Sequence, residues 1–470
     1  MASIVVNGAG AVGLLSAMLL ADDGHDVVVL ERDPAPPPPS SEAWETWTRR
    51  GVNQFHLLHF LLPRFRLEAV QALPRVVQAL EQAGALTLNV IAGAPEQMTG
   101  GPRPGDEDYT SITARRPVAE AVLADCAERT PRVTIRRGTV VAGVRTGSPC
   151  RPGVPHVTGV VTEDGEQIGA DLVVDATGRR SPLPTWLETV GARPPLEERE
   201  DSGFVYYGRH FRSADGSHPA IIGPLAQPYG SFSVLTLPAD NGTWGVGVIA
   251  SAADGAMRAA RQVGTWTATV RSLPLCAHWL DGEAIEDGVQ VMAKIEDRYR
   301  CYLVEGEPVA TGVVALADSW ACTNPAMGRG ISIGLLHALA LRDVLRSSGD
   351  DPVASALAYD EATRSAVEPW YRDTVAVDRH RLAEIEAHIQ GRSYRSDDPL
   401  WHIWRSLNAA AGADPDCFRA LLRIIGLLQT ADEVLAAPGL LDKALALGAD
   451  WAEVPDFGPD RAELLSILAA

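Results

Sequence analysis

The first 32 residues constrain the fold of this chain more than any other stretch. The apolar run Ser3–Val6 predicts a strand, Gly8–Gly13 has the spacing G-x-G-x-x-G, and Leu14–Ala21 predicts an apolar helix. A second apolar strand, Val27–Leu30, ends at Glu31. This order predicts a βαβ unit that binds a dinucleotide, with the pyrophosphate at the N-terminus of the helix.

Each residue of this turn has its own physical role. Gly8 permits a tight turn, Gly10 lets a pyrophosphate approach the backbone, and Gly13 lets the helix lie close to the strand. Glu31 is placed to accept hydrogen bonds from an adenosine ribose. A signal peptide or membrane anchor would have similar hydrophobicity, but this stretch lacks a basic N-terminal region and is interrupted by glycines. We therefore predict a dinucleotide site.

The composition excludes several classes of partner. The formal net charge is −19 at pH 7, whereas nucleic acids and anionic membranes both require a basic surface. The six cysteines are scattered without C-x-x-C pairs, which predicts a reduced, cytoplasmic protein and no metal site. No stretch beyond the first helix is long and apolar enough to span a bilayer. At 470 residues, two or three substructures are expected.

Apolar periodicity divides the chain into four parts. Residues 1–180 predict the first part of the nucleotide-binding domain, with an excursion towards the substrate near 50–110. From 181 to 300 the period changes to two, which predicts an antiparallel substrate domain. Residues 301–350 return to the first domain, and 351–470 predict a helical region. The predicted fold class is α/β, a Rossmann-type domain with an inserted antiparallel sheet and a helical C-terminal region.

Three finer assignments depend on local patterns. Val133–Val144 predicts a pair of strands, Ala220–Leu225 predicts one strand of the inserted sheet, and Ala253–Leu273 predicts a helix that interrupts that sheet.

Three motifs far apart in the sequence each include or follow a buried apolar strand. The first is Gly8–Glu31, the second is Asp175–Ser181 after Leu172–Val174, and the third is Asp318–Gly330 after Val313–Leu316. Because ligands bind beyond the carboxyl ends of parallel strands, the three turns are predicted to meet at one edge of one sheet.

Together these motifs resemble the FAD-dependent monooxygenase superfamily related to para-hydroxybenzoate hydroxylase, over about residues 1–345. That superfamily includes flavin-dependent epoxidases, geranylgeranyl reductases and flavin halogenases, and the likeness is strongest to the bacterial FAD-dependent epoxidase and oxidoreductase branch. The resemblance implies that FAD is the cofactor. The residues implied to bind it are Gly8, Gly10, Gly13, Glu31, Arg32, Arg116, Val141, Asp318, Pro325, Gly328 and Gly330.

The resemblance also implies individual roles. Arg116, which forms an Arg-Pro-x-x-Glu pattern with Glu120, would reach the cofactor, and Val141 would meet the adenine through its backbone. Asp318 would bond the ribityl chain, although Ala317 stands where the family has glycine. Amides and the helix dipole of the loop 325–330 would face the pyrimidine end of the flavin.

The segment Gly51–His59 resembles a Gly-Val-Pro-Gln to His-x-His stretch of FAD-dependent epoxidases. Asn53 replaces the proline, and His56 stands where an arginine is usual. The likeness implies that the segment lies by the flavin and makes His59 the candidate catalytic residue, with a structural histidine as the alternative. Family halogenases rely on a lysine in the N-terminal third, and the first lysine here is Lys294, so halogenation is discounted.

The implied reaction is monooxygenation through a flavin C4a-hydroperoxide formed with O2. It would hydroxylate or epoxidise a hydrophobic aromatic or polyene small molecule in secondary metabolism, with electrons from NADPH or NADH or from a separate flavin reductase. The candidate substrate-pocket residues are Tyr206, Tyr207, Arg209 and His210, for which ordinary sheet packing is the alternative. Two other functions stay open: an FAD-dependent dehydrogenase or double-bond reductase, and a non-catalytic flavin-binding protein.

Overall fold

A five-stranded parallel sheet forms the centre of the computed structural model, which describes residues 1–347, 349, 351–453 and 458–470. The strand order is β20-β9-β1-β2-β5, and every neighbouring pair is parallel. This sheet confirms the predicted α/β class. Its strands are β1 (Ser3–Asn7), β2 (Asp26–Glu31), β5 (Val133–Arg137), β9 (Leu172–Asp175) and β20 (Val313–Ala315).

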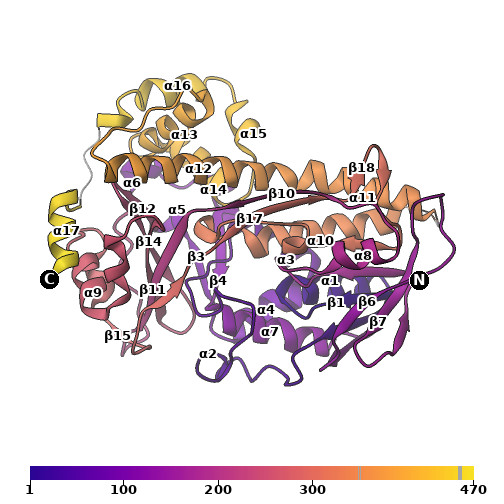
Figure 1. Cartoon of the computed structure of the whole chain (residues 1–470). Coiled ribbons are helices and arrows are strands. Elements are labelled where there is room, and N and C mark those ends of the chain that lie inside the picture. The colour runs from indigo at the N-terminus through magenta and orange to yellow at the C-terminus, as the bar shows by residue number, and fades with distance from the viewer. Residues whose placement is uncertain (348, 350, 454–457) are drawn as a thin grey trace.

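Both faces of the parallel sheet are buried (Figure 1). Ile4 and Val6 pack against helices, whereas Val5 packs against a small antiparallel sheet on the other face. Burial on both faces explains why β1, β2, β9 and β20 read as largely apolar runs, whereas the edge strand β5 does not. The covering elements are α1 (Ala11–Asp22), α3 (Pro63–Ala72), α4 (Pro74–Gln82), α7 (Arg116–Glu128) and α10 (Gly330–Ser347) on one face, and β6 (Val141–Thr146), β7 (Val157–Thr162), β8 (Gln167–Gly169) and α8 (Leu183–Thr189) on the other.

The segment Val133–Val144 contains one strand and the start of a second, but these two strands do not pair with each other, contrary to the prediction. β5 continues the parallel sheet beside β2, whereas β6 pairs with β7 in the small antiparallel sheet. Gly138, with φ of +68°, lies in the turn between them and sends the chain from one sheet to the other.

The inserted region forms a second, antiparallel sheet in the order β12-β13-β14-β11-β15, with β16 also paired to β11. Ala220–Leu225 is not a strand, because Gly223 and Pro224 interrupt it, and the edge strand begins at Ala226 instead. The strands are β11 (Phe204–Arg212), β12 (Ala226–Tyr229), β13 (Phe232–Pro238), β14 (Thr243–Ser251), β15 (Glu283–Ala284) and β16 (Gln290–Met292).

The predicted helix Ala253–Leu273 is divided in two. A 3₁₀ segment, η2 (Ala256–Arg261), precedes α9 (Val263–Arg271), and Gln262 between them is extended, with ψ of 133°. Both pieces cover the back of the antiparallel sheet, where Trp266 is fully buried.

Two long strands join the two halves of the molecule, β10 (Leu196–Asp201) and β17 (Glu296–Cys301). They pair antiparallel along six residues, and β17 also pairs with β21 (Ala321–Cys322). In Figure 1 these ribbons run between the antiparallel sheet and the parallel sheet. They therefore connect the inserted region to the chain around Asp318.

The remainder of the chain is mainly helical. α12 runs alongside β10, and α17 lies beside α9 (Figure 1). No helix of the described residues is long and apolar enough to cross a membrane. The helices are α11 (Pro352–Ala366), α12 (Glu368–Ile389), α13 (Pro399–Ala410), α14 (Pro415–Ile425), α15 (Ala431–Leu435), α16 (Leu440–Leu447) and α17 (Arg461–Ala469).

Short elements complete the region before α7. Residues 51–60 form neither helix nor strand, and lie between α2 and α3. The short elements are α2 (Ala43–Thr46), β3 (Leu86–Asn89), α5 (Val90–Gly93), α6 (Glu96–Thr99), η1 (Asp106–Tyr109) and β4 (Thr110–Thr113).

The contact between α1 and the end of β1 gives the first prediction. A Cβ on Gly13 would lie 2.1 Å from the carbonyl oxygen of Gly8, so Gly13→Ala forces α1 away from the sheet. We expect Gly13→Ala to lower the free energy of unfolding by about 1–3 kcal/mol, as overpacked core positions do. Urea unfolding followed by circular dichroism measures it.

Gly143→Ala in β6 is the matched control, because nothing in the described chain lies within 4 Å of its added Cβ. It should change the free energy of unfolding by less than about 1 kcal/mol, towards higher stability. Equal stabilities of the two variants would contradict the close packing of α1.

Candidate flavin site

The three predicted motifs meet at one edge of the parallel sheet. β1, β9 and β20 are neighbours, and each turn begins where its strand ends. A Cβ on Gly8 would lie 2.6 Å from the carbonyl oxygen of Ala176, and the Gly178 amide donates to Ser319 Oγ at 2.9 Å. The predicted convergence of the motifs is confirmed.

The glycine turn leaves an open helix N-terminus. Gly8 has φ of +111°, which only glycine adopts without strain. No side chain of the described residues caps α1, and an added Cβ on Gly10 would approach only Arg49 Nη1, at 3.9 Å. The first amides of α1 can therefore donate to a bound anion.

Glu31 is buried and held in place beside this turn. Its Oε2 accepts from the Ala9 amide at 3.0 Å and from Arg49 Nη2 at 2.9 Å, and its Oε1 accepts from the Asp33 amide at 3.0 Å. Arg49 Nη1 also donates to Glu120 Oε2 at 2.6 Å. Arg49 thus joins two buried carboxylates in front of the glycine turn.

Arg49 is the site residue that the sequence analysis missed. It directly precedes the Arg50–His59 stretch, but no spacing rule connects it to Glu31 or Glu120. The only available signal was its position just before a segment already expected at the flavin.

A second cluster joins Arg116, Glu120, His59 and Asp318. Arg116 Nε donates to Glu120 Oε1 at 2.6 Å. Burial, together with the smaller effect of the Arg116 charge, lowers the pKa of His59 to about 4. His59 is therefore neutral at pH 7, and its buried Nδ1 has no hydrogen-bond partner in the described chain.

Asp318 follows β20 at the mouth of this cluster. Burial raises the pKa of its carboxyl above the usual range, while the charges of Arg116 and Arg179 partly offset the rise. Among the described residues, no hydrogen-bond donor reaches this carboxylate, which is left able to accept from a bound group.

The turn before Asp318 is built from inside the protein. Ala317 has φ of +51°, a left-handed conformation that favours glycine, and its amide donates to His337 Nδ1 at 3.1 Å. Burial lowers the pKa of His337 to about 3, so the ring is neutral and can accept this bond. Its Nε2 contacts the Tyr359 hydroxyl at 2.6 Å, and that hydroxyl donates to the Ala315 carbonyl at 2.9 Å.

Two arginines of β17 support the second and third turns from behind. Arg300 is buried and donates Nη1 to the Ser319 carbonyl at 2.6 Å and Nη2 to the Arg179 carbonyl at 3.4 Å. Arg298 Nη1 donates to the same Arg179 carbonyl at 3.2 Å. The inserted region is therefore attached directly to the site.

The loop before α10 lies next to the segment that carries His59. Pro325 begins a short 3₁₀ turn, Gly328 has φ of +66°, and α10 starts at Gly330. An added Cβ on Gly328 would lie 3.6 Å from the carbonyl oxygen of Phe60. The loop and residues 51–60 therefore face each other.

Arg32 and Val141 lie at the outer side of this edge. Arg32 Nη2 donates to the Arg50 carbonyl at 2.7 Å, so it holds the start of the 51–60 segment. Val141 begins β6, two residues after Thr139, whose amide donates to the Glu31 carbonyl at 2.9 Å. A cofactor contact by either residue stays a prediction.

The four substrate-pocket candidates separate into two pairs, because side chains alternate along β11. Tyr206 and His210 point towards residues 44–58 and Asn324, and the Tyr206 hydroxyl donates to Asn324 Oδ1. Tyr207 and Arg209 point to the opposite face. Tyr207 belongs to the core beneath α9, and Arg209 Cζ lies 5.7 Å from the centroid of the Trp266 ring. Tyr207 and Arg209 therefore cannot line a pocket on the side of the sheet that carries Tyr206 and His210.

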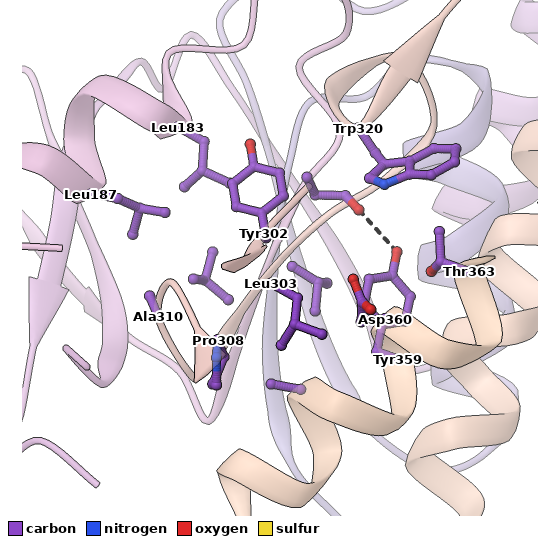
Figure 2. A pocket seen from close by; sticks show the side chains of 14 residues that line it. Leu183, Leu187, Tyr302, Leu303, Pro308, Ala310, Trp320, Tyr359, Asp360 and Thr363 are labelled. Carbon is purple, nitrogen blue, oxygen red and sulfur yellow. Dashed lines mark hydrogen bonds between the residues drawn. The ribbon is translucent and has the colours of Figure 1, made fainter. Parts of the chain in front are cut away.

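A small, mainly apolar pocket lies elsewhere, between α8, α11 and β20 (Figure 2). Its volume of about 40 Å³ is far below that of an ordinary ligand pocket, about 300–1,000 Å³. Tyr302 contributes a hydroxyl that has no hydrogen-bond partner in the described part of the chain. Within those residues there is also no group of three His, Cys, Asp or Glu side chains placed to hold a metal ion.

Comparison with known proteins places this geometry in a wider context. No protein-family model matches the chain. Protein Rv3254 of Mycobacterium tuberculosis is 27% identical over 473 residues, which cover 94% of this chain and 93% of that protein.

Solved structures identify the fold. PqsL of Pseudomonas aeruginosa, described as a probable FAD-dependent monooxygenase, matches with a TM-score of 0.58 at 17% identity, over 82% of this chain and 99% of PqsL. The chain has the fold of the FAD-dependent monooxygenases. A variant of 2-methyl-3-hydroxypyridine-5-carboxylic acid oxygenase also gives 0.58 at 17% identity, over 82% and 93% of the two chains.

The monooxygenase fold does not carry one reaction alone. The Diels-Alderase PyrE3, from the biosynthetic pathway of pyrroindomycins, matches with a TM-score of 0.58 at 19% identity, over 90% of this chain and 80% of PyrE3. The resemblance seen in the sequence is thus confirmed at the level of the fold, while the reaction must be argued from the site.

The strained turn at Ala317 gives the second prediction. A left-handed backbone conformation costs a non-glycine residue about 1–2 kcal/mol. Glycine relieves this strain, but it also gives the unfolded chain more conformational entropy, which offsets part of the gain in stability. We expect Ala317→Gly to raise the free energy of unfolding by up to about 1 kcal/mol. Thermal unfolding measures the change.

Ala315→Gly, two residues earlier in β20, is the control without positive φ. It should lower the stability by about 0.5–1 kcal/mol, since glycine weakens a strand. A loss of stability in both variants would show that Ala317 is not strained.

Proposed function

We propose that this chain binds FAD and catalyses a monooxygenation of a hydrophobic small molecule. The observation that carries the proposal is the convergence of an uncapped helix N-terminus, the free Asp318 carboxylate and the 325–330 loop at one sheet edge. These are donors and acceptors in the order that a dinucleotide with a ribityl chain and a flavin ring requires. Bound FAD supplies the redox chemistry with O2.

The fit of the cofactor rests on the uncapped N-terminus of α1 and on two charged side chains held beside it. The amides at the start of α1, with Gly8, Gly10 and Gly13, would take the pyrophosphate, and Glu31 the ribose. Arg49 would reach the phosphates, since it already lies over Gly10.

The flavin half of FAD would lie against the second group of residues. Asp318 would accept from the ribityl hydroxyls, and the backbone of Pro325, Gly328 and Gly330 would face the pyrimidine end. His59, with its neutral ring and unpartnered Nδ1, would accept a hydrogen bond from a group bound there. Arg32, Arg116 and Val141 complete the proposed cofactor contacts.

The proposed overall reaction consumes one O2 and two electrons per product. One oxygen atom enters an aromatic ring or an alkene of the substrate, and the other leaves as water with two protons. NADPH or NADH, or a separate flavin reductase, would supply the electrons. The role of the protein is to orient the substrate and to exclude water.

The first experiment records the visible absorption of the purified protein, then its bleaching under anaerobic conditions with NADPH or NADH. We expect the spectrum of bound oxidised flavin, followed in turnover by one labelled atom in the product from isotopically labelled O2. Turnover without incorporated label would indicate the dehydrogenase or reductase instead. Failure to bind FAD even after reconstitution would reject the proposal.

The third prediction concerns Asp318. A carboxylate that accepts hydrogen bonds from a ligand contributes about 1.5–3 kcal/mol, so Asp318→Ala should weaken FAD binding about 10- to 100-fold. Quenching of flavin fluorescence during titration of the apoprotein measures the dissociation constant.

Asp125→Ala is the control, because Asp125 is exposed on α7 and pairs only with Arg129 within the described residues. It should leave FAD affinity unchanged. Unaltered affinity in Asp318→Ala would remove this carboxylate from the proposed site.

A further inference from the structure

The antiparallel sheet has a patch of glycines, without side chains, on the face that points to the candidate flavin site. Gly208 of β11 lies opposite Gly247 of β14, and His210 lies opposite Gly245. Directly opposed residues of an antiparallel pair project on the same face, so the three glycines form one surface without side chains. We call Gly208, Gly245 and Gly247 the glycine floor.

Two leucines of the irregular segment 51–60 occupy the space above this floor. An added Cβ on Gly245 would lie 2.6 Å from Leu58 Cγ, and one on Gly247 would lie 3.2 Å from Leu58 Cδ1. An added Cβ on Gly208 would lie 2.9 Å from Leu57 Cδ2. The floor therefore defines a volume that these two side chains fill without any hydrogen bond of their own.

An unpartnered polar atom is directed at the floor. His210 is only 2% exposed, its Nδ1 lies 2.9 Å from Glu286 Oε1, and its amide donates to Glu286 Oε2 at 2.7 Å. Its Nε2 has no partner among the described residues and lies 3.0 Å from the position of an added Cβ on Gly245. The Glu286 carboxylate accepts a hydrogen bond from Nδ1–H, and in that tautomer Nε2 presents a lone pair to the floor.

The opposite end of the floor carries a second polar side chain. Tyr206, on the same face of β11, lies four residues before His210, about 13 Å along the strand at ~3.3 Å per residue. Its hydroxyl is held by Asn324 in the loop before α10. Polar side chains thus lie at both ends of the floor, and Gln290 of β16 lies opposite Gly208 at its side.

We propose that the glycine floor is the substrate site, and that it takes a planar, hydroxylated aromatic molecule whose hydroxyl donates to His210 Nε2. This inference rests on the proposed function and names the substrate class of that site. The ring replaces Leu57 and Leu58, whose contacts with the floor are purely apolar. A flat ring gains contact across all three glycines, whereas a puckered ring of the same size touches them only in part.

Glu286 acts here as a positioning residue. It fixes the ring of His210 through Nδ1 and leaves Nε2 over the floor. The Trp44 ring, 4.6 Å from the His210 ring, closes the other side of the imidazole. Leu58 acts as a placeholder that keeps water off the floor when no substrate is bound.

The test measures binding to the FAD-loaded full chain by isothermal titration calorimetry with three two-ring probes. 2-Naphthol is planar with a hydroxyl, 2-methoxynaphthalene is planar without a donor, and decahydro-2-naphthol has the hydroxyl on puckered rings. We expect 2-naphthol to bind about tenfold more tightly than either, as one lost hydrogen bond or one lost ring contact of about 1.4 kcal/mol implies.

Two variants should act in opposite directions. Gly247→Val meets only the flexible end of Leu58 but raises the floor, so it should weaken 2-naphthol binding at least about tenfold. Leu58→Ala removes the side chain that fills the floor, so it should tighten the binding of 2-naphthol. Gly143→Val, in a strand of a different sheet with nothing of the described chain within 4 Å, should leave the affinity unchanged.

His210→Phe keeps a ring but removes the acceptor, and should abolish the preference for 2-naphthol over its methyl ether. Unchanged affinity in Gly247→Val, weaker binding in Leu58→Ala, or a preserved preference in His210→Phe would each overturn the assignment. The FAD content of every sample is measured separately. If FAD is bound but the probe affinities do not depend on these residues, the glycine floor is not the substrate site and the proposed function still stands. If no FAD is bound, the proposed function itself is rejected.

Discussion

The close approach of the glycine turn to its neighbours is the constraint on which the rest of the site depends. Gly13 packs on Gly8, and Gly8 packs on Ala176, so the first and second turns lie as near as two backbones can. The second turn is in turn bonded to Ser319 beside Asp318. Three strands of one parallel sheet therefore bring together residues separated by more than half of the sequence. A side chain at either glycine would separate these edges.

Buried charge is organised around this edge so that each group has a definite state. Arg49 and Arg116 share Glu120, and both arginines are neutralised by carboxylates while facing the space where a cofactor would lie. His59 and His337 are neutral because burial opposes their protonation. The site thus combines fixed ion pairs with neutral imidazoles, a combination that changes little in charge across the physiological pH range.

Much of this architecture could be predicted from local pattern. The spacing of Gly8, Gly10 and Gly13 and the apolar runs before Asp175 and Asp318 specify the strands and turns, because buried parallel strands have a plain signature. β10 could not be recognised, since Leu196–Asp201 is mostly charged and its stabilising partners lie on β17 and α12. Arg49 was missed for the same reason, as its carboxylate partners are distant in the sequence. The alternation along β11 predicts that Tyr206 and Tyr207 lie on opposite faces of the sheet. Which of them faces the candidate flavin site depends on the face that α9 covers.

The position of α17 has a consequence for how the protein is made. The antiparallel sheet is complete once Met292 has been synthesised, yet its back face is closed by Leu464 and Leu468 of α17, which pack in the same core as Trp266. During translation η2 and α9 can cover most of this face at once, but the part that α17 closes stays uncovered while α10 to α16 are added. Such a face is prone to aggregate and invites a chaperone. Slow or paused synthesis of the helical region would lengthen that exposure, so the yield of native protein should depend on the rate of elongation there.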